Sequence, residues 1–424
     1  MRLLDDLAVD RQTLLDAQAE NLDLMRRAVL ASGTCTAFRP RAELLTPDGL
    51  ARIAPTTREQ LADWGARPAA PHRITSGDTR LILRSSGSSG RVRTLRHDRL
   101  FNERVERLGA RGLSLEGLGD NPAVVNAMAP GDLFGGYGFV DAVLARHGAA
   151  VLPAGTVLPA AHLAELIEDV DVRALVSLPV HIERLLAVVP EAMARLAAVY
   201  YLGDRMDAAL TRRLTAHGTR VRSFAYSTTE TGPIGYQCDR LTGAEHHVHE
   251  DLVVAEVLDD EHRPLPDGTS GALAVTVLAT TGTALVRYLV GDHAVLRPSD
   301  CPCGSPARIL RVGDRDGASA NIDGTVVTKA MFDEALRPAG LPQDGVYQIG
   351  VTVRDGRFRL ALRGAALSQV GDEACTAALA KHQTLCILTD SSRFAGLSVE
   401  AGEPPRATTR GKVQFFWHER NTDD

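Results

Sequence analysis

Residues 84–94 read Arg-Ser-Ser-Gly-Ser-Ser-Gly-Arg-Val-Arg-Thr and follow a short apolar run, residues 81–83, that predicts a strand. Glycine admits positive φ and lets several backbone N–H groups point toward one spot, while the serine hydroxyls add donors. Arg91 and Arg93 add positive charge where the loop ends. This composition indicates a loop that wraps a polyphosphate. A flexible serine–glycine linker is the alternative that the loop alone leaves open.

Length and charge narrow the class of protein. A chain of 424 residues is too long for one compact core and predicts two or three domains. The net charge is −6 with no basic tract, so no nucleic-acid partner is expected. No apolar run has the length of a membrane span, and the charged N-terminus lacks the apolar core of a signal peptide. A cytoplasmic protein that does not enter a membrane is therefore expected.

The pattern of apolar residues changes along the chain. Residues 1–80 have helical spacing broken by prolines. From residue 81 to about 312, apolar segments such as 123–128 and 174–178 alternate with amphipathic helical ones, which predicts an α/β fold with a largely parallel sheet. Between residues 252 and 296 strand-like runs meet glycine, proline and aspartate turns. We therefore expect a small antiparallel β-subdomain there.

A polar, glycine-bearing segment at residues 313–317 separates a last part of different composition. Helical patterns at 329–336 and 372–381 accompany two strand patterns that flank Asp355-Gly356, a hairpin turn signal. This α+β composition predicts a smaller domain joined by a hinge. The expected domains are residues 1–313 and residues 314–424.

Four further segments, in order along the chain, combine with the serine–glycine loop into a family pattern. They are Leu133-Phe134-Gly135-Gly136-Tyr137 with the following residues 146–149, Tyr226-Ser227-Thr228-Thr229-Glu230, Arg287-Tyr288-Leu289-Val290-Gly291-Asp292, and Gly411-Lys412. Together they resemble the adenylate-forming enzymes, the superfamily of acyl-CoA synthetases and aryl adenylating enzymes. Within that superfamily the chain looks most like the phenylacetate–CoA ligase branch, over nearly its whole length.

The resemblance implies a nucleotide site in the first domain and a mobile lid in the second. The loop would hold the β- and γ-phosphates of ATP, Thr229 an α-phosphate oxygen, and Glu230 the Mg²⁺ ion, a cation that favours oxygen ligands. Asp292 would accept from both ribose hydroxyls, and Tyr226 would lie near the adenine. Lys412 would bridge phosphate and carboxylate oxygens, so Lys412, Thr229 and Glu230 are the expected catalytic residues. The full expected nucleotide-binding set is Ser85, Ser86, Gly87, Ser88, Ser89, Gly90, Arg91, Gly203, Asp204, Tyr226, Ser227, Asp292 and Arg315.

Phe134, Gly135 and Tyr137 would line the acyl pocket by the same resemblance. Alternatives remain for single residues. Taken alone, Glu230 and Asp292 could be solvated loop acids, Lys412 a lysine of the tail, Tyr226 a core tyrosine, and the segment containing Gly203 a plain strand-to-helix turn.

The chain also departs from the family pattern. Arg91 stands where a lysine usually ends the loop, Ser227 replaces a glycine, and Leu289 replaces an arginine. The hinge arginine, Arg315, is displaced by one position, which leaves the pivot residue and the second half-reaction open.

Cys301-Pro302-Cys303-Gly304 has the form of a metal knuckle, and cysteine with histidine in a reducing cytoplasm favours zinc. The related branch has a cysteine, a histidine before a glutamate–aspartate pair, and a late cysteine-x-cysteine. By that pattern Cys238, His247, Cys301 and Cys303 would make a closed, structural zinc site. Unligated cysteines in a turn are the alternative, because a one-residue gap is tighter than usual.

The implied activity is ATP-dependent activation of a small, aromatic carboxylic acid as an acyl-AMP, with release of pyrophosphate and transfer to a thiol such as that of coenzyme A. An alternative is a diazotase of secondary metabolism that adenylates nitrite and passes it to an aryl amine. A carrier-protein thiol as acceptor and a non-catalytic nucleotide-binding relative are further alternatives. The sequence leaves the oligomeric state open, a homodimer included.

Overall fold

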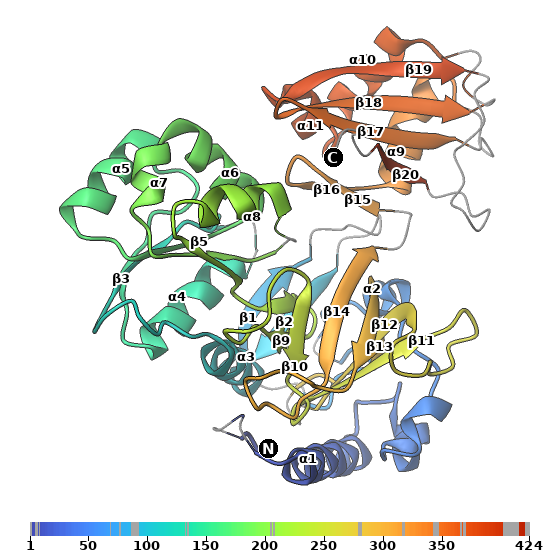
Figure 1. Ribbon diagram of the computed structural model, residues 1–424. Helices are drawn as coiled ribbons and strands as arrows, with labels where there is room; N and C mark the ends of the chain where they lie inside the picture. Colours follow the sequence, from blue (N-terminus) through green and yellow to red (C-terminus); the bar gives the residue numbers. More distant parts are fainter. Residues whose placement is uncertain are drawn as a thin grey trace. The chain divides into compact units, whose positions relative to one another are not determined.

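The computed structural model describes residues 2–4, 7, 9–67, 69–75, 78–85, 93–131, 133, 135–203, 206, 208–278, 282–315, 319–341, 347–364, 367, 370–401 and 415–419. These residues form two compact units, and the chain passes from the first to the second between Gly313 and Asp314. Each unit is described by itself (Figure 1). The functions expected of the two domains remain predictions.

A parallel sheet forms one part of the first unit, as the alternating pattern predicted. Its strand order is β4-β3-β5-β6-β7, and every pair is parallel. Successive residues of a strand point to opposite faces: Val124 and Val176 pack in one apolar cluster, and Val125 and Leu175 in the other. The strands are β3 (Ala123–Asn126), β4 (Ala150–Leu152), β5 (Ala174–Ser177), β6 (Ala198–Tyr201) and β7 (Arg220–Ser223).

Helices cover both faces of this sheet, so it is the middle of three layers (Figure 1). Helices α5–α8 pack with Val125 and Leu175, while α4 packs on the opposite face through Val140 and Val143. The helices are α3 (Arg99–Gly112), α4 (Gly136–Arg146), α5 (Ala160–Asp169), α6 (Pro179–Val188), α7 (Pro190–Ala194) and α8 (Ala208–Thr215).

The antiparallel sheet of the first unit is larger than the sequence indicated. Its strand order is β11-β12-β13-β14-β10-β9-β8. The sequence placed residues 226–248 in the alternating α/β part, but they form three short strands of this sheet, because their turns bring them back beside one another instead of leading into helices. The strands are β8 (Tyr226–Thr228), β9 (Gly232–Tyr236), β10 (Glu245–Val248), β11 (Val253–Leu258), β12 (Ser270–Val277), β13 (Leu285–Arg297) and β14 (Ile309–Arg315).

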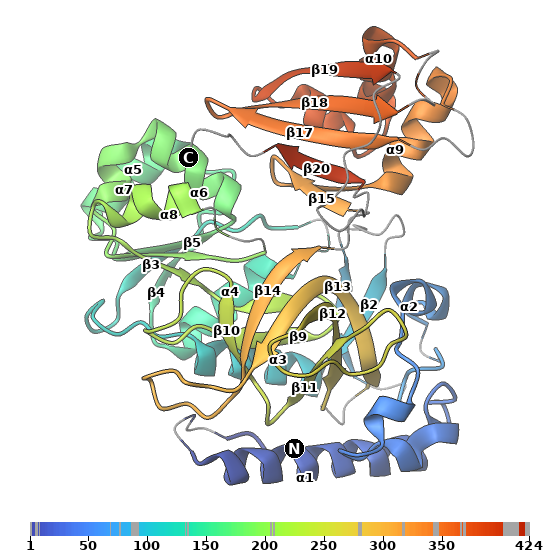
Figure 2. The same cartoon turned by 45° about the vertical axis from the view of Figure 1, so that its right-hand side comes forward.

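The N-terminal part supports this sheet. Helix α1 (Arg11–Ala31) begins at an Asp10 cap and packs Leu22, Met25 and Val29 against Val286 of β13. Figure 2 shows α1 running along the antiparallel sheet. Short elements follow: η1 (Arg39–Leu44), η2 (Leu50–Arg52) and α2 (Arg58–Trp64), then the antiparallel pair β1 (Thr79–Arg84) and β2 (Thr94–Asp98).

The second unit has its own core and is α+β, as predicted. Its sheet has the order β19-β18-β17-β20, with β17 and β18 antiparallel across a turn at Asp355-Gly356 in which both residues have positive φ. Phe332, Leu336 and Leu379 from two helices fill the core. The elements are β15 (Ser319–Ile322), β16 (Thr325–Thr328), α9 (Lys329–Leu336), η3 (Arg337–Ala339), β17 (Gln348–Arg354), β18 (Arg357–Gly364), α10 (Asp372–Lys381), α11 (Cys386–Asp390), β19 (Phe394–Ala401) and β20 (Phe416–Glu419).

Of the helices that the structure describes, none combines the length and the hydrophobicity that a membrane span requires.

Candidate nucleotide site and cysteine–histidine cluster

The described ends of the serine–glycine loop are held together by backbone pairing. Ser85 N donates to Arg93 O at 2.9 Å, and Arg93 N donates to the Ser85 hydroxyl at 3.2 Å. Strands β1 and β2 continue this pairing through Arg84 and Thr94. The loop thus starts and ends at one fixed place. Ser86, Gly87, Ser88, Ser89, Gly90 and Arg91, the rest of the predicted phosphate loop, lie outside the described residues.

Arg93 joins this loop base to the predicted metal ligand. Its Nε donates to Glu230 Oε1 at 2.8 Å, and each side chain is only 5% exposed. Burial raises the pKa of the Glu230 carboxyl, but the charge and hydrogen bond of Arg93, helped by the charge of Arg58, outweigh it and hold that pKa below its ordinary value. Glu230 is therefore a buried carboxylate rather than the solvated loop acid that its sequence context allowed.

Tyr288 connects the second acidic motif to the same carboxylate. It lies on β13, is 1% exposed, and is close enough to Glu230 for the carboxylate charge to act on its phenol. Burial is the main cause that raises the pKa of its phenol, and the Glu230 charge adds to it. The phenol therefore stays protonated. Two motifs that lie far apart in the sequence are neighbours here.

Asp292, the residue predicted to bind ribose, is hydrogen-bonded to Tyr226, the residue predicted to lie near the adenine. The Tyr226 hydroxyl donates to Asp292 Oδ2 at 2.7 Å, and Asp292 is 8% exposed. Three strands separate β8 from β13 in the sheet order, a distance of about 19 Å in a flat sheet. A tyrosine cannot span that distance, so the sheet curls until β8 faces β13. This curvature brings the two motifs together.

His97 fixes the backbone of the turn between β8 and β9. Its Nε2 donates to the Thr229 carbonyl at 2.8 Å, which requires the tautomer that carries its proton on Nε2. Burial is the main cause that lowers the pKa of His97 to about 4, so the ring is neutral at pH 7. The Thr231 N–H donates to the Thr228 hydroxyl at 3.2 Å and tightens the turn further.

Arg58 is a second cation beside this site. It begins helix α2, and its guanidinium donates to the Val290 carbonyl next to Gly291. Gly291 has a φ of +85°, and a Cβ there would overlap the Arg58 guanidinium. Glycine is thus favoured at this position for two reasons: the backbone has a positive φ, and the absence of a Cβ leaves space for the Arg58 guanidinium.

We expect Gly291→Ala to destabilise the protein by more than its φ alone explains. Gly268 is the matched control, because its φ is +86° and a Cβ added there would meet no other atom within 4 Å. A positive φ at a non-glycine residue costs about 1–3 kcal/mol, and Gly268→Ala should lose only that amount in urea unfolding. Gly291→Ala should lose more because it displaces Arg58. Equal losses of unfolding free energy in the two variants would show that the position of Arg58 against Gly291 does not contribute to stability.

The remaining predicted residues lie around the parallel sheet. Gly203 follows β6 with a φ of +89°, and a Cβ there would come within 2.9 Å of Leu178. Gly135 precedes α4 and lies close to Leu83 of β1. Tyr137 lies in the first turn of α4, where its carbonyl accepts from Asn126. Among the described residues, no hydrogen bond or ion pair joins these three to Asp292. Asp204, Phe134, Lys412 and the side chain of Arg315 lie outside the described part of the chain.

Cys238, His247, Cys301 and Cys303 form a second cluster, and their ligand atoms all lie within 4.8 Å of one another. Cys238 Sγ is 3.5 Å from Cys301 Sγ, and Cys303 Sγ is 3.2 Å from His247 Nε2. These separations suit a tetrahedral ion with metal–sulfur bonds of about 2.3 Å. His247 Nδ1 donates to the Ala307 carbonyl at 3.0 Å, so Nε2 keeps its lone pair for a metal. The cluster can hold a metal ion with four protein ligands.

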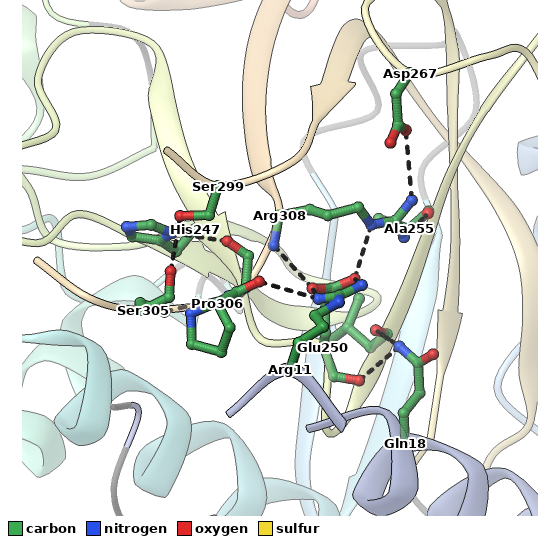
Figure 3. Close-up of polar contacts among 12 residues, drawn as sticks. Arg11, Gln18, His247, Glu250, Ala255, Asp267, Ser299, Ser305, Pro306 and Arg308 are labelled. Atoms are coloured by element: carbon green, nitrogen blue, oxygen red, sulfur yellow. Dashed lines mark hydrogen bonds and ion pairs between the residues drawn. The ribbon is translucent and has the colours of Figure 1, made fainter. Parts of the chain in front are cut away.

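A buried acid ties this cluster to helix α1 (Figure 3). Glu250 accepts from Arg308 Nε at 2.8 Å and pairs with Arg11 of α1, whose guanidinium also donates to the Pro306 carbonyl at 3.2 Å. Gln18 of α1 donates to the Glu250 carbonyl at 2.7 Å. The chain segment that carries Cys301 and Cys303 thus continues directly into Pro306 and Arg308, which contact Arg11 of α1 and Glu250.

Three residues of the site were missed or left without a partner by sequence reasoning. The sequence indicated Arg93 only as a positive charge at the end of the loop. Tyr288 was noted only as part of a motif, and Arg58 was not noted at all. Their roles depend on contacts between segments more than 50 residues apart, such as Arg93 with Glu230 at a separation of 137. Positive charge next to the serine–glycine loop was the available signal for Arg93.

Comparison with known proteins shows the family of the chain. The sequence profile of the AMP-binding enzyme family matches residues 24–280, more than half of the chain. The chain belongs to this family, and so to the adenylate-forming superfamily. Phenylacetate-coenzyme A ligase of Thermus thermophilus is 27% identical over 273 residues, which are 61% of this chain. The match covers 58% of that relative, less than two thirds of its length.

Solved structures agree with the fold. A crystal structure of 2-hydroxyisobutyryl-CoA ligase in complex with 2-HIB-AMP and CoA has a TM-score of 0.75 at 18% identity, over 98% of this chain and 92% of that one. An o-succinylbenzoate CoA synthetase from Bacillus subtilis has a TM-score of 0.50 at 12% identity, over 80% of this chain and 68% of that one. The predicted α/β architecture with an antiparallel subdomain and a C-terminal α+β part is confirmed.

Proposed function

We propose that this protein is an ATP-dependent ligase that activates a small aromatic carboxylic acid as an acyl-AMP, releases pyrophosphate, and transfers the acyl group to a thiol such as that of coenzyme A. The observation that carries the proposal is the convergence of two family motifs on one buried place, where the Tyr226 hydroxyl donates to Asp292 and the charge of Glu230 acts on Tyr288. The 27% identity to a phenylacetate-coenzyme A ligase supports the class of acid.

The roles of single residues follow from chemistry. Asp292 has two carboxylate oxygens for the two ribose hydroxyls, and Tyr226 has to exchange its hydrogen bond to Asp292 when a ribose enters. Thr229, held by His97, presents its hydroxyl to the α-phosphate. Lys412 bridges the α-phosphate and the attacking carboxylate, because a cation between two anions lowers their repulsion as they approach. Arg315 is assigned to the nucleotide by resemblance.

Two metals fit the residues present. Glu230 offers the oxygen ligand that Mg²⁺ prefers, and bound Mg²⁺ would offset charge on the leaving pyrophosphate. Cys238, His247, Cys301 and Cys303 would hold Zn²⁺ as a structural ion, because four protein ligands leave no position for a reacting water.

Exchange of radioactive pyrophosphate into ATP tests the proposed activity. We expect exchange with one or more members of a panel of aryl and arylacetic acids, without nitrite, and a coenzyme A thioester detected by mass when coenzyme A is added. Exchange that occurs only with nitrite, with a diazo product from an aryl amine, would replace this proposal by the diazotase alternative, which the substitutions at Ser227 and Leu289 keep open. Binding of ATP without exchange under any condition would indicate a non-catalytic relative.

A further inference from the structure

The carboxylate of Glu230 already has a cation bound to it. Arg93 Nε lies 2.8 Å from Oε1, within hydrogen-bond distance, and both side chains are only 5% exposed. In this environment a guanidinium and a carboxylate interact more strongly than at the surface, and removing either partner leaves an uncompensated charge. A metal ion that needs the same carboxylate therefore has to compete with Arg93.

The surroundings of Glu230 also oppose a free divalent cation. Arg93 and Arg58 are two positive charges close to the negative charge of Glu230, and Glu59 adds a negative charge that acts on Arg93. The charge of Arg58 acts on Glu230 and on Tyr288. A free Mg²⁺ ion would meet the positive charges of both arginines beside Glu230, whereas an ion bound to a triphosphate brings negative charge with it.

Arg93 is also well placed to change partners. Its backbone is fixed by the two hydrogen bonds to Ser85 at the base of the serine–glycine loop. Only its side chain has to swing for the guanidinium to leave Glu230, and guanidinium groups bind phosphate as well as carboxylate.

We propose that Arg93 is an exchangeable counter-ion of Glu230, which keeps free Mg²⁺ from the carboxylate and moves to phosphate when nucleotide and metal arrive together. The inference rests on the proposed function only in assigning phosphates to this place. It predicts that the Glu230 carboxylate binds Arg93 in the free protein and a divalent ion in the nucleotide complex.

Binding of Mn²⁺, measured by electron paramagnetic resonance with the zinc-loaded full-length protein, tests this exchange without requiring turnover. Wild-type protein should show no Mn²⁺ site that depends on Glu230 until ATP is added. Arg93→Gln should gain such a site without nucleotide, with affinity at least about tenfold above that of wild type, because one positive charge next to the ion has been removed. Adding Glu230→Gln to that variant should abolish the new site.

Two controls separate this role from a purely structural ion pair. Arg99→Gln breaks an exposed pair with Asp78, in which the two side chains are 62% and 66% exposed, and should leave Mn²⁺ binding unchanged. Arg93→Lys keeps the charge and should exclude free Mn²⁺ as wild type does. A Glu230-dependent Mn²⁺ site in nucleotide-free wild type, or a folded Arg93→Gln variant that gains none, would overturn the inference. If Arg93→Gln does not fold, wild type with and without ATP still gives the deciding comparison.

The proposed function can fail separately. Absence of pyrophosphate exchange with every acid would contradict the ligase activity but leave the nucleotide-free Mn²⁺ result intact.

Discussion

Lys412→Ala should slow formation of the acyl adenylate by about 10²–10³-fold, the loss typical of removing one group that stabilises developing charge. Binding of MgATP, measured by calorimetry, should change little, because Lys412 is expected to act on the reacting oxygens and not on the nucleotide as a whole. The rate is measured as release of pyrophosphate in a single turnover with a saturating acid. Transfer of the acyl group from a pre-formed adenylate to the thiol should be much less affected.

The chain offers two matched controls, because it has only three lysines, Lys329, Lys381 and Lys412. Lys381 is exposed in the last turn of α10, and Lys329 is paired with Asp333 at 2.6 Å. Lys381→Ala should leave every step unchanged. Lys329→Ala should lower the stability of the protein more than it lowers the rate of adenylate formation. A Lys412→Ala enzyme that forms adenylate at the wild-type rate would contradict the role of Lys412.

Removal of metal from the cysteine–histidine cluster is expected to lower the melting temperature by about 5–10 °C. A ligand held at 100 times its dissociation constant stabilises the folded state by about 2.7 kcal/mol, and each kcal/mol corresponds to about 2–4 °C in a domain of this size. We also expect faster proteolysis within residues 299–308, because that segment joins the cluster to Glu250 and helix α1. The measurements are metal content, a melting curve and limited proteolysis before and after chelation.

Cys303→Ser should reproduce the effects of chelation, since it removes one of the four ligands. Cys386→Ser is the control, because Cys386 lies in α11 outside the cluster. An unaltered melting temperature after complete loss of metal, or a purified protein with no bound metal and full stability, would contradict a structural zinc site.

The sequence predicted the elements of the fold better than their pairing. Apolar runs such as residues 174–178 and 198–202 became buried strands of the parallel sheet, because a strand covered on both faces must be apolar throughout. Residues 226–248 had no strand prediction of their own and lay within the region described as alternating. Their strands are only three to five residues long, too short for a periodic pattern that distinguishes parallel from antiparallel pairing.

The site could be predicted as a set of motifs but not as a set of contacts. The resemblance of their motifs to those of the adenylate-forming enzymes indicated Glu230 and Asp292, and the chemistry of nucleotide binding explains why carboxylates stand there. No local pattern could show that Arg93 pairs with Glu230 or that Tyr226 reaches Asp292. The second contact requires the curl of a seven-stranded sheet, which results from the packing of many side chains.

The cysteine–histidine cluster was easier to predict, because Cys301 and Cys303 are close in sequence and the pattern of the related branch pointed to Cys238 and His247 as the other two ligands. The structure brings the four ligand atoms together. The pairing of His247 Nδ1 with the Ala307 carbonyl could not be predicted, since it depends on how β10 lies beside β14.

The fate of the carboxylate oxygen of the acid tests most directly whether the protein forms an acyl adenylate. An acid labelled with ¹⁸O in its carboxylate is incubated with ATP, Mg²⁺, coenzyme A and the wild-type protein, and the nucleotide products are analysed by mass. Attack of the carboxylate on the α-phosphate, followed by thiol transfer, must leave one ¹⁸O atom in AMP. Labelled AMP is the result that we predict, whereas unlabelled AMP, or label in orthophosphate with ADP as the product, would contradict adenylate formation.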